Sequence, residues 1–255
     1  MIVCTAIDRK YLPGLKALWN SIKKNSPDVE FWVLAHGDTS LLDDIRALGI
    51  DNVLLNPELG TDTRFPSSSE WPEEIPAMYS RLWMPNLFIQ AKRSLWLDAD
   101  TIVLEDLSPL FEIDMKGYAV AGTTSADPSG RAKLIETQVT GPLRRGEKGH
   151  TGITSGVIVY SHTDWFRQEM LRKCLEIMNA RPELNLKFVV QSVLNLALRG
   201  RYFELDQSWQ VQGNRRDLLR KLHDAKIVHY IGMTPWERCD IPHQEENAEI
   251  WRSFL

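Results

Sequence analysis

The order of apolar and polar positions predicts alternating strands and helices in the first part of the chain. Short, nearly continuous apolar runs over 2–7, 30–35 and 52–55 indicate buried strands. The segments 11–24 and 41–48 instead carry apolar residues at three- and four-residue spacing, which is typical of helices that pack on one face. This β-α-β-α-β order predicts a parallel sheet with helices on both faces.

Both kinds of element continue through the rest of the chain. Apolar patterns predict helices over 77–90, 163–179, 189–198 and 247–254, and strands over 118–122, 152–160 and 227–230. The segment 60–76 is polar and rich in Pro, Ser and Thr, so we expect a long loop of the kind that often forms a functional lid.

A pair of carboxylates interrupts the apolar segment 95–103. Asp98 and Asp100 follow a strand-like run, and two negative charges this close repel each other unless a cation lies between them. Hard oxygen ligands favour Mg²⁺ or Mn²⁺. The pattern predicts a divalent-cation site at the carboxyl end of a strand, where open α/β sheets bind ligands. The alternative is an acidic, solvent-exposed turn.

A histidine near the C-terminus offers a further ligand. His229 lies in the apolar run 227–230, and Gly232 and Pro235 follow it, which permit close backbone approach and fix a turn. An imidazole at the end of a strand can bind a metal. The alternative is a structural histidine packed beside Trp236.

Three polar residues suit contacts to a nucleotide or sugar. Asp8, at the end of the first predicted strand, either accepts hydrogen bonds from a ribose or base or caps the following helix. Tyr11 either stacks on a base or packs in the protein. Arg81, on the helix before the carboxylate pair, either contacts a phosphate or sugar hydroxyl or lies on the surface.

Small polar residues and one amide complete the set of interest. Thr154, Ser155 and Gly156 precede an apolar run and either line a pocket or form a bulge or tight turn. Gln191, near the start of a predicted helix, either faces a ligand or is an ordinary polar position of an amphipathic helix.

Composition narrows the class of protein. The 255 residues are 43% hydrophobic and 25% charged with a net charge of −4, which is typical of a soluble globular domain and not of a nucleic-acid-binding protein. Cys4, Cys174 and Cys239 form neither a metal motif nor a disulfide framework, and Cys4 is expected to be buried. No apolar run is long enough to predict a membrane span. We therefore expect a cytoplasmic protein with reduced thiols.

These motifs, in this order, resemble glycosyltransferase family 8, the retaining GT-A family that includes glycogenin-like and lipopolysaccharide galactosyl- and glucosyltransferases. The resemblance runs from Ile2 to about Trp236 and is most specific over 79–82, 97–100 and 106–111. It implies an α/β fold, a single Rossmann-like GT-A domain over 1–255 with a mixed, mostly parallel sheet. The nucleotide-sugar half would span about 1–122 and the acceptor half about 123–255.

The resemblance also implies the site and its ligands. Asp98, Asp100 and His229 would bind Mn²⁺, or Mg²⁺, at the diphosphate of a nucleotide sugar that is usually UDP-linked. Gln191, near the anomeric carbon, and Arg81 would be catalytic, and the acceptor would be a carbohydrate, glycolipid or glycoprotein, with peripheral membrane contact allowed. The remaining donor-binding positions are Thr5, Ala6, Ile7, Asp8, Tyr11, Arg81, Ala99 and Gly232. The positions on the substrate and acceptor side are Thr154, Ser155, Gly156 and Gln191.

Three positions depart from the family pattern. Thr154-Ser155-Gly156 stands where the family usually has Asn-x-Gly, and Val190 stands where it has an Asp. Thr234 replaces a diphosphate-binding Lys in a segment that is one residue short. Either another cation replaces this Lys, or the donor differs from UDP-galactose and UDP-glucose.

Two other functions remain open. A sugar nucleotidyltransferase shares the metal carboxylates but normally has a Gly-rich phosphate loop where this chain has Asp8-Arg9-Lys10-Tyr11. A non-catalytic nucleotide-sugar or glycan-binding protein would explain the replaced Asp and Lys.

Overall fold

The computed structural model describes residues 1–59, 75–124, 139–140, 152–180, 185–186, 189–212, 224–231, 234–237 and 245–255. The chain forms two compact units, and each combines segments that are distant in sequence. The first contains Met1–Pro57, Leu95–Ile113 and Asp206–Leu255, and the second contains Glu58–Ser94 and Asp114–Leu205. Nearly all of the predicted loop 60–76 lies outside the described residues, as does Gly232.

The first unit begins with the predicted β-α-β-α-β order. Strand β1 is parallel to β2, with Ile2 opposite Glu30, and β2 is parallel to β3, with Val33 opposite Val53. The apolar helical positions Leu15, Leu18 and Ile22 are fully buried, as the spacing predicts. These elements are β1 (Ile2–Ile7), the 3-10 helix η1 (Arg9–Tyr11), α1 (Leu12–Asn25), β2 (Glu30–Ala35), α2 (Thr39–Ala47) and β3 (Val53–Leu55).

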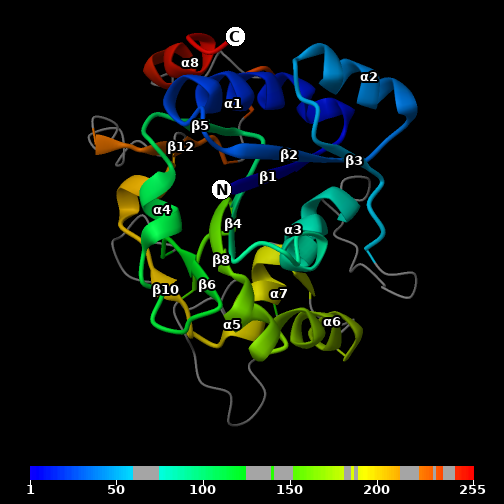
Figure 1. The fold of residues 1–255 in the computed structure, drawn as a ribbon, viewed down its shortest axis with the longest axis vertical. Helices are drawn as coiled ribbons and strands as arrows, with labels where there is room; N and C mark the ends of the chain where they lie inside the picture. Colours follow the sequence, from blue (N-terminus) through cyan, green and yellow to red (C-terminus); the bar gives the residue numbers. More distant parts are fainter. Residues whose placement is uncertain are drawn as a thin grey trace. The chain divides into compact units, whose positions relative to one another are not determined.

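A second, three-stranded sheet completes this unit. Its middle strand β12 (Ile227–His229) is parallel to β11 (Val211–Gln212) and antiparallel to β5 (Thr101–Val103). The C-terminal helix α8 (Glu245–Arg252) lies beside α1 (Figure 1). Trp251 and Phe254 bury their side chains there against Ala17 of α1. The C-terminal segment is therefore part of the core of the first unit. Two short helices, α4 (Ser108–Glu112) and η3 (Gln207–Gln210), also belong to it.

The second unit has mixed pairing. Strand β6 is parallel to β10 and antiparallel to β8, and helices α6 and α7 pack side by side (Figure 1). Together with the parallel strands of the first unit, this confirms the α/β class with mixed, mostly parallel pairing. Its elements are α3 (Ile75–Leu87), β6 (Val120–Gly122), β7 (Val139–Thr140), β8 (Val157–Ser161), α5 (His162–Arg167), α6 (Met170–Ala180), β9 (Asn185–Leu186), α7 (Val189–Leu198) and β10 (Phe203–Glu204). Strand β4 (Arg93–Leu97) begins in the second unit and ends in the first.

Two element predictions are wrong in detail. The single helix predicted over 163–179 is two helices, because Glu169 adopts φ 51°, which a right-handed helix cannot contain. The strand predicted over 152–160 begins only at Val157, and before it Ile153 forms one isolated bridge with Thr124. The expectation that Cys4 is buried is confirmed.

Candidate active site and metal centre

The carboxylate pair lies in a tight turn between β4 and β5. Asp98 accepts two hydrogen bonds at its carbonyl oxygen, from the backbone N–H of Thr101 at 3.1 Å and from the Thr101 hydroxyl at 2.7 Å. These bonds close the turn, and β4 and β5 fix its two ends. The spacing of Asp98 and Asp100, which are separated by Ala99, is therefore fixed as well.

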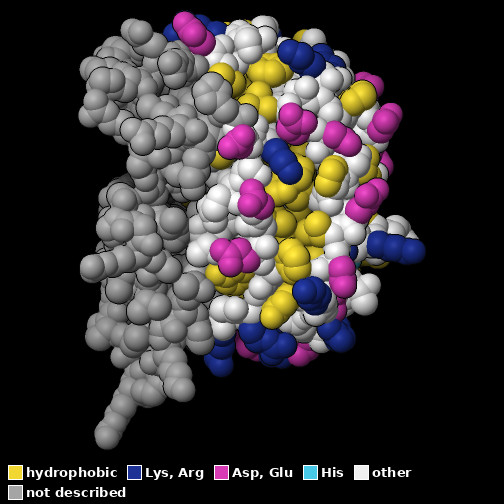
Figure 2. All heavy atoms as spheres, turned by 90° about the vertical axis from the view of Figure 1, so that its left-hand side faces the viewer, with side chains coloured by type: hydrophobic (Ala, Val, Ile, Leu, Met, Phe, Trp, Pro, Cys, Tyr) yellow, Lys and Arg dark blue, Asp and Glu magenta, His cyan; other side chains and the backbone are white. Residues whose placement is uncertain are grey.

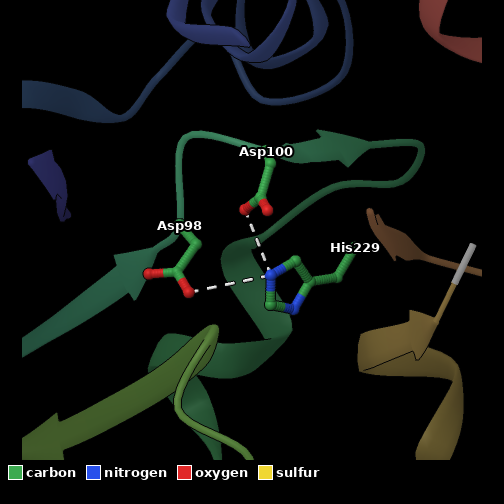
Figure 3. Close-up of side chains that lie close together, drawn as sticks. All are labelled: Asp98, Asp100 and His229. Carbon is green, nitrogen blue, oxygen red and sulfur yellow. Dashed lines mark ion pairs between the residues drawn. The ribbon is translucent and has the colours of Figure 1, made fainter. Parts of the chain in front are cut away.

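Strand pairing brings His229 to this turn. In the antiparallel pairing of β12 with β5, His229 is opposite Thr101, and the next residue, Tyr230, donates its N–H to the Asp100 carbonyl at 2.9 Å. Nε2 of His229 lies 3.1 Å from Asp100 Oδ1 and 3.7 Å from Asp98 Oδ2. Figure 3 shows both carboxylates pointing toward the imidazole ring. The structure therefore assembles all three predicted metal ligands.

The donor set fits a divalent cation. Each of the three residues offers one ligand atom, and these atoms lie within 4.8 Å of one another. The side chains are largely buried, since only 20% of Asp98, 12% of Asp100 and 6% of His229 is exposed. Two carboxylates and an imidazole are a mixed oxygen and nitrogen set that suits a first-row divalent ion such as Mn²⁺. The alternative of an exposed acidic turn is excluded by this burial.

Two further side chains hold the ligands in place. Trp96 donates from its indole N–H to Asp98 Oδ1 at 2.8 Å, so the other carboxylate oxygen faces His229. Gln210, only 3% exposed, forms a 2.8 Å hydrogen bond with Nδ1 of His229 through its amide nitrogen. Such contacts fix the orientation of metal ligands.

Sequence reasoning missed both of these residues. Trp96 could have been found, because it lies two residues before Asp98 and alternate residues of a strand share a face. Gln210 gave no signal, because its contact with His229 depends on how η3 and β12 meet in space.

The candidate nucleoside residues lie in the same unit as the metal ligands. Asp8 Oδ1 accepts from the backbone N–H groups of Lys10 at 2.9 Å and Tyr11 at 3.3 Å, so Asp8 caps the 3-10 helix η1. The ring of Tyr11 packs edge-on against Trp236, with centroids 5.7 Å apart. Asp8 therefore caps a helix and Tyr11 packs against another ring, and their contacts to a nucleoside stay predictions.

The start of α1 closely approaches the carboxylate turn. A Cβ atom placed on Gly14 would lie 2.6 Å from the Ala99 carbonyl oxygen and 2.5 Å from Cη2 of Trp236. Only glycine permits this approach. In the preceding strand, the side chains of Thr5 and Ile7 are buried and that of Ala6 is half-buried.

A second cluster lies within the second unit and joins three predicted residues. Arg81 donates from Nη1 to the Ser155 carbonyl at 2.6 Å and to its hydroxyl at 2.9 Å. The backbone N–H of Ser155 donates to Oε1 of Gln191 at 3.0 Å. Arg81 is buried, with 6% exposed, so it is not the surface residue of the alternative interpretation.

The neighbours of this cluster stabilise its backbone. Thr154 shares a buried 2.9 Å hydrogen bond with the Thr123 hydroxyl and donates its backbone N–H to the Thr123 carbonyl at 3.0 Å. Asn195 pairs with the backbone of Ile153 through both ends of its amide, at 2.9 and 2.8 Å. Gly156 is buried directly after Ser155. These contacts fix the backbone around Ser155, so its carbonyl and hydroxyl stay within hydrogen-bonding distance of Arg81.

Comparison with known proteins decides the family. Residues 2–240 match the family model of Glycosyl transferase family 8. The chain belongs to glycosyl transferase family 8.

Relatives of this family 8 chain include bacterial proteins of different sizes. General stress protein A of Bacillus subtilis is 29% identical over 190 residues, which cover 67% of this chain and 63% of that protein. Lipopolysaccharide 1,2-glucosyltransferase of Escherichia coli is 24% identical over 258 residues, which cover 94% of this chain and 73% of that protein. Glycosyltransferase GlyB of Streptococcus pneumoniae is matched over only 41% of its length. The chain thus spans less than two thirds of the length of General stress protein A and of GlyB.

A solved structure shows that the family 8 chain has the GT-A fold of a known transferase. The galactosyltransferase LgtC, in complex with donor and acceptor sugar analogues, superposes with a TM-score of 0.72 at 20% identity. The match covers 99% of this chain and 96% of LgtC. This likeness concerns the fold.

The surface of the family 8 chain agrees with its balanced composition. On the face drawn in Figure 2, acidic and basic side chains of the described residues are interspersed with apolar ones. None of the described helices combines the length and apolar character required to cross a membrane.

Proposed function

We propose that this chain is a metal-dependent, retaining glycosyltransferase that moves a hexose from a UDP-linked donor to a hydroxyl of a carbohydrate, glycolipid or glycoprotein. The observation that carries the proposal is the convergence of three side chains in a family 8 chain: Asp98 and Asp100 from the turn before β5, and His229 from the strand β12 that pairs with β5. Two of the similar proteins are named a glucosyltransferase and a galactosyltransferase, which supports a sugar donor.

The three ligands would hold Mn²⁺ or Mg²⁺, which supplies positive charge to the leaving diphosphate when bound. The chain's own contribution is to hold these side chains ready. Trp96 fixes one oxygen of Asp98, and the turn closed by Thr101 fixes the spacing of the two carboxylates. A preorganised site of this kind needs no rearrangement during the reaction. Asp8 and Tyr11 would contact the nucleoside, together with backbone groups of Thr5, Ala6, Ile7, Ala99 and Gly232.

The Arg81 cluster would bind the sugar. Gln191 uses its carbonyl oxygen to accept from Ser155, so its amide N–H groups are the part that can reach a substrate. A carboxamide is a poor nucleophile, which favours front-face attack in which the leaving phosphate accepts the proton of the acceptor hydroxyl. Arg81 and Gln191 would therefore position the sugar, with Thr154, Ser155 and Gly156 on its acceptor side.

We propose that Lys10 supplies the positive charge that the family's lysine provides, because Thr234 stands at that position in this chain. Thr234 donates its hydroxyl to Glu237, and Nζ of Lys10 lies 3.9 Å from the same carboxylate. Lys10 thus places a positive charge next to the replaced position. Lys10→Met is expected to raise the KM for the nucleotide sugar with little change in the melting temperature, because the ion pair is exposed.

A donor screen tests the proposed function. Thermal shift with a panel of nucleotide sugars should show selective stabilisation that requires Mn²⁺, because a ligand that binds only the folded state stabilises it. Asp100→Asn should abolish this shift, while Asp51→Asn, an exposed carboxylate of the same unit, should not.

Product analysis then separates the alternatives. Transfer with an unchanged anomeric configuration supports the proposal, and an inverted product contradicts it. Pyrophosphate release from a nucleoside triphosphate and a sugar phosphate would indicate a nucleotidyltransferase. Donor binding without turnover across a donor and acceptor panel would indicate a non-catalytic binding protein.

A further inference from the structure

The imidazole of His229 is held from both sides by groups of different chemistry. Its Nε2 faces the carboxylates of Asp98 and Asp100, and its Nδ1 is 2.8 Å from the amide nitrogen of Gln210. In a neutral histidine only one ring nitrogen carries a proton, so these two contacts are linked. When the proton is on Nε2, Nδ1 can accept a hydrogen bond from the amide N–H of Gln210, whose nitrogen faces Nδ1 in the structure.

Binding a cation reverses this requirement. A metal takes the lone pair of Nε2, so the proton must then lie on Nδ1 and needs an acceptor. A carboxamide can supply either partner, because half a turn about its last bond exchanges the N–H₂ group and the carbonyl oxygen. Neither a carboxylate nor an ammonium group could satisfy both forms.

Gln210 is itself firmly held. It lies at the end of η3, which Asp206 caps by accepting the N–H of Ser208 at 2.9 Å. The N–H of Lys226 donates to the Ser208 carbonyl at 2.8 Å, which ties η3 to the segment leading into β12. Gln210 is buried, so its amide faces His229 without exposure to solvent. A buried amide on a braced helix is suited to orient a neighbouring ring.

We propose that Gln210 is a positioning residue for the cation site: its amide holds the His229 ring and turns over to accept the Nδ1 proton when Nε2 binds a divalent cation. The inference rests on the proposed function, because it assumes that the site binds a cation. It goes beyond that function by assigning a role to a residue outside the three ligands.

Calorimetric titration with Mn²⁺ alone tests the inference without any sugar. Gln210→Leu should lower the affinity for Mn²⁺ by roughly 10–100-fold, which is the usual cost of losing a group that orients a metal ligand. Gln210→Glu keeps a hydrogen-bond acceptor for the Nδ1 proton on a side chain of the same length, so this variant should bind Mn²⁺ at least as tightly as the unaltered protein. Gln210→Asn is too short and should behave like the leucine variant.

Gln207→Leu is the matched control, because it removes the same carboxamide from the other end of η3. Nuclear magnetic resonance of ¹⁵N-histidine-labelled protein with Zn²⁺ adds a readout that a merely structural role would not move. A slowly exchanging Nδ1–H signal of His229 is expected in the unaltered protein and in Gln210→Glu, and not in Gln210→Leu.

Several outcomes would overturn the inference. Unchanged Mn²⁺ affinity in Gln210→Leu, or an equal loss in Gln207→Leu, contradicts it. If the leucine variant does not fold, equal affinities of the Glu and Asn variants contradict it instead. Failure of the unaltered protein to bind Mn²⁺ would refute the proposed function itself, and the inference with it.

Discussion

Replacing Gly14 by alanine tests how closely α1 approaches the carboxylate turn. The added methyl would lie 2.6 Å from the Ala99 carbonyl oxygen, about 0.8 Å short of the 3.4 Å at which ordinary contact begins. It would also lie 2.5 Å from Cη2 of Trp236, a ring already packed against Tyr11 and Trp251. Neither neighbour is the free end of a flexible side chain, so the backbone must move.

Two opposing effects set the expected change in stability. Alanine favours a helix over glycine by about 1 kcal/mol. Forcing a methyl group into a packed site costs about 1–3 kcal/mol. The balance is a loss of about 1 kcal/mol, which lowers the melting temperature by about 2–4 °C in a protein of this size.

The effect on metal binding should exceed the effect on stability. Ala99 lies between Asp98 and Asp100, and the ligand distances of a well-formed metal site lie within about 0.2 Å of their usual values. A shift of the turn that makes room for the methyl therefore disturbs both carboxylates. We expect Gly14→Ala to weaken Mn²⁺ binding by at least about tenfold, as loss of ligand orientation does.

The measurements are a thermal melt and a calorimetric Mn²⁺ titration. Gly37→Ala is the control, because its Cβ would meet only the Leu41 side chain, at 3.1 Å, and that side chain can turn away. The reasoning is refuted if Gly14→Ala keeps both the melting temperature and the Mn²⁺ affinity of the unaltered protein. A lower melting temperature with an unchanged Mn²⁺ affinity would show that the displacement caused by the methyl group does not reach Asp98 and Asp100.

Three further changes probe the other contacts. Trp96→Phe removes the N–H donor to Asp98 and should lower Mn²⁺ affinity about tenfold in a calorimetric titration, with Trp32→Phe, an exposed indole contact elsewhere, as a control that leaves it unchanged. Arg81→Lys removes the guanidinium that donates to both the carbonyl and the hydroxyl of Ser155. It should reduce the free energy of unfolding, measured in urea, by about 1–3 kcal/mol. An unchanged free energy would mean that lysine makes the same contacts. Burial lowers the pKa of His162 from its ordinary 6.5 to about 4, so its neutral form stabilises the fold fully above pH 6.5 and this contribution is lost as the pH falls toward 4. His162→Gln should therefore recover about 2–3 kcal/mol relative to the unaltered protein between pH 7 and 4.5, and parallel pH profiles of the two proteins would contradict this.

The sequence predicted the elements better than their boundaries. Helices α5 and α6 each bury one apolar face, so the helical spacing of apolar residues is the same before and after Gln168 and Glu169. This periodicity could not reveal that the helix predicted over 163–179 is interrupted there. The break lies in a local backbone conformation, φ 51° at Glu169, that glycine or asparagine usually marks. No such residue stands there.

The metal ligands were predictable from the sequence, and of the two residues that hold them in place only Trp96 gave a sequence signal. Asp98 and Asp100 are one residue apart in sequence. His229 was predicted as a possible ligand from its place at the end of an apolar run, and the family resemblance then assigned it to the same metal. Their meeting depends on the pairing of β12 with β5, which no local pattern encodes. The contact of Gln210 with His229 depends on how η3 packs against β12, so it could be seen only in three dimensions.

The pairing of β12 with β5 also has a consequence for the order of events during synthesis. About half of the 255-residue chain separates the carboxylate pair from His229, so the two carboxylates leave the ribosome long before their third partner. Contacts between such distant segments are the slow ones to form, because a long loop must close first. The cation site is therefore complete only when the segment that carries His229 has docked, and an ion bound there would stabilise the docked position of that segment.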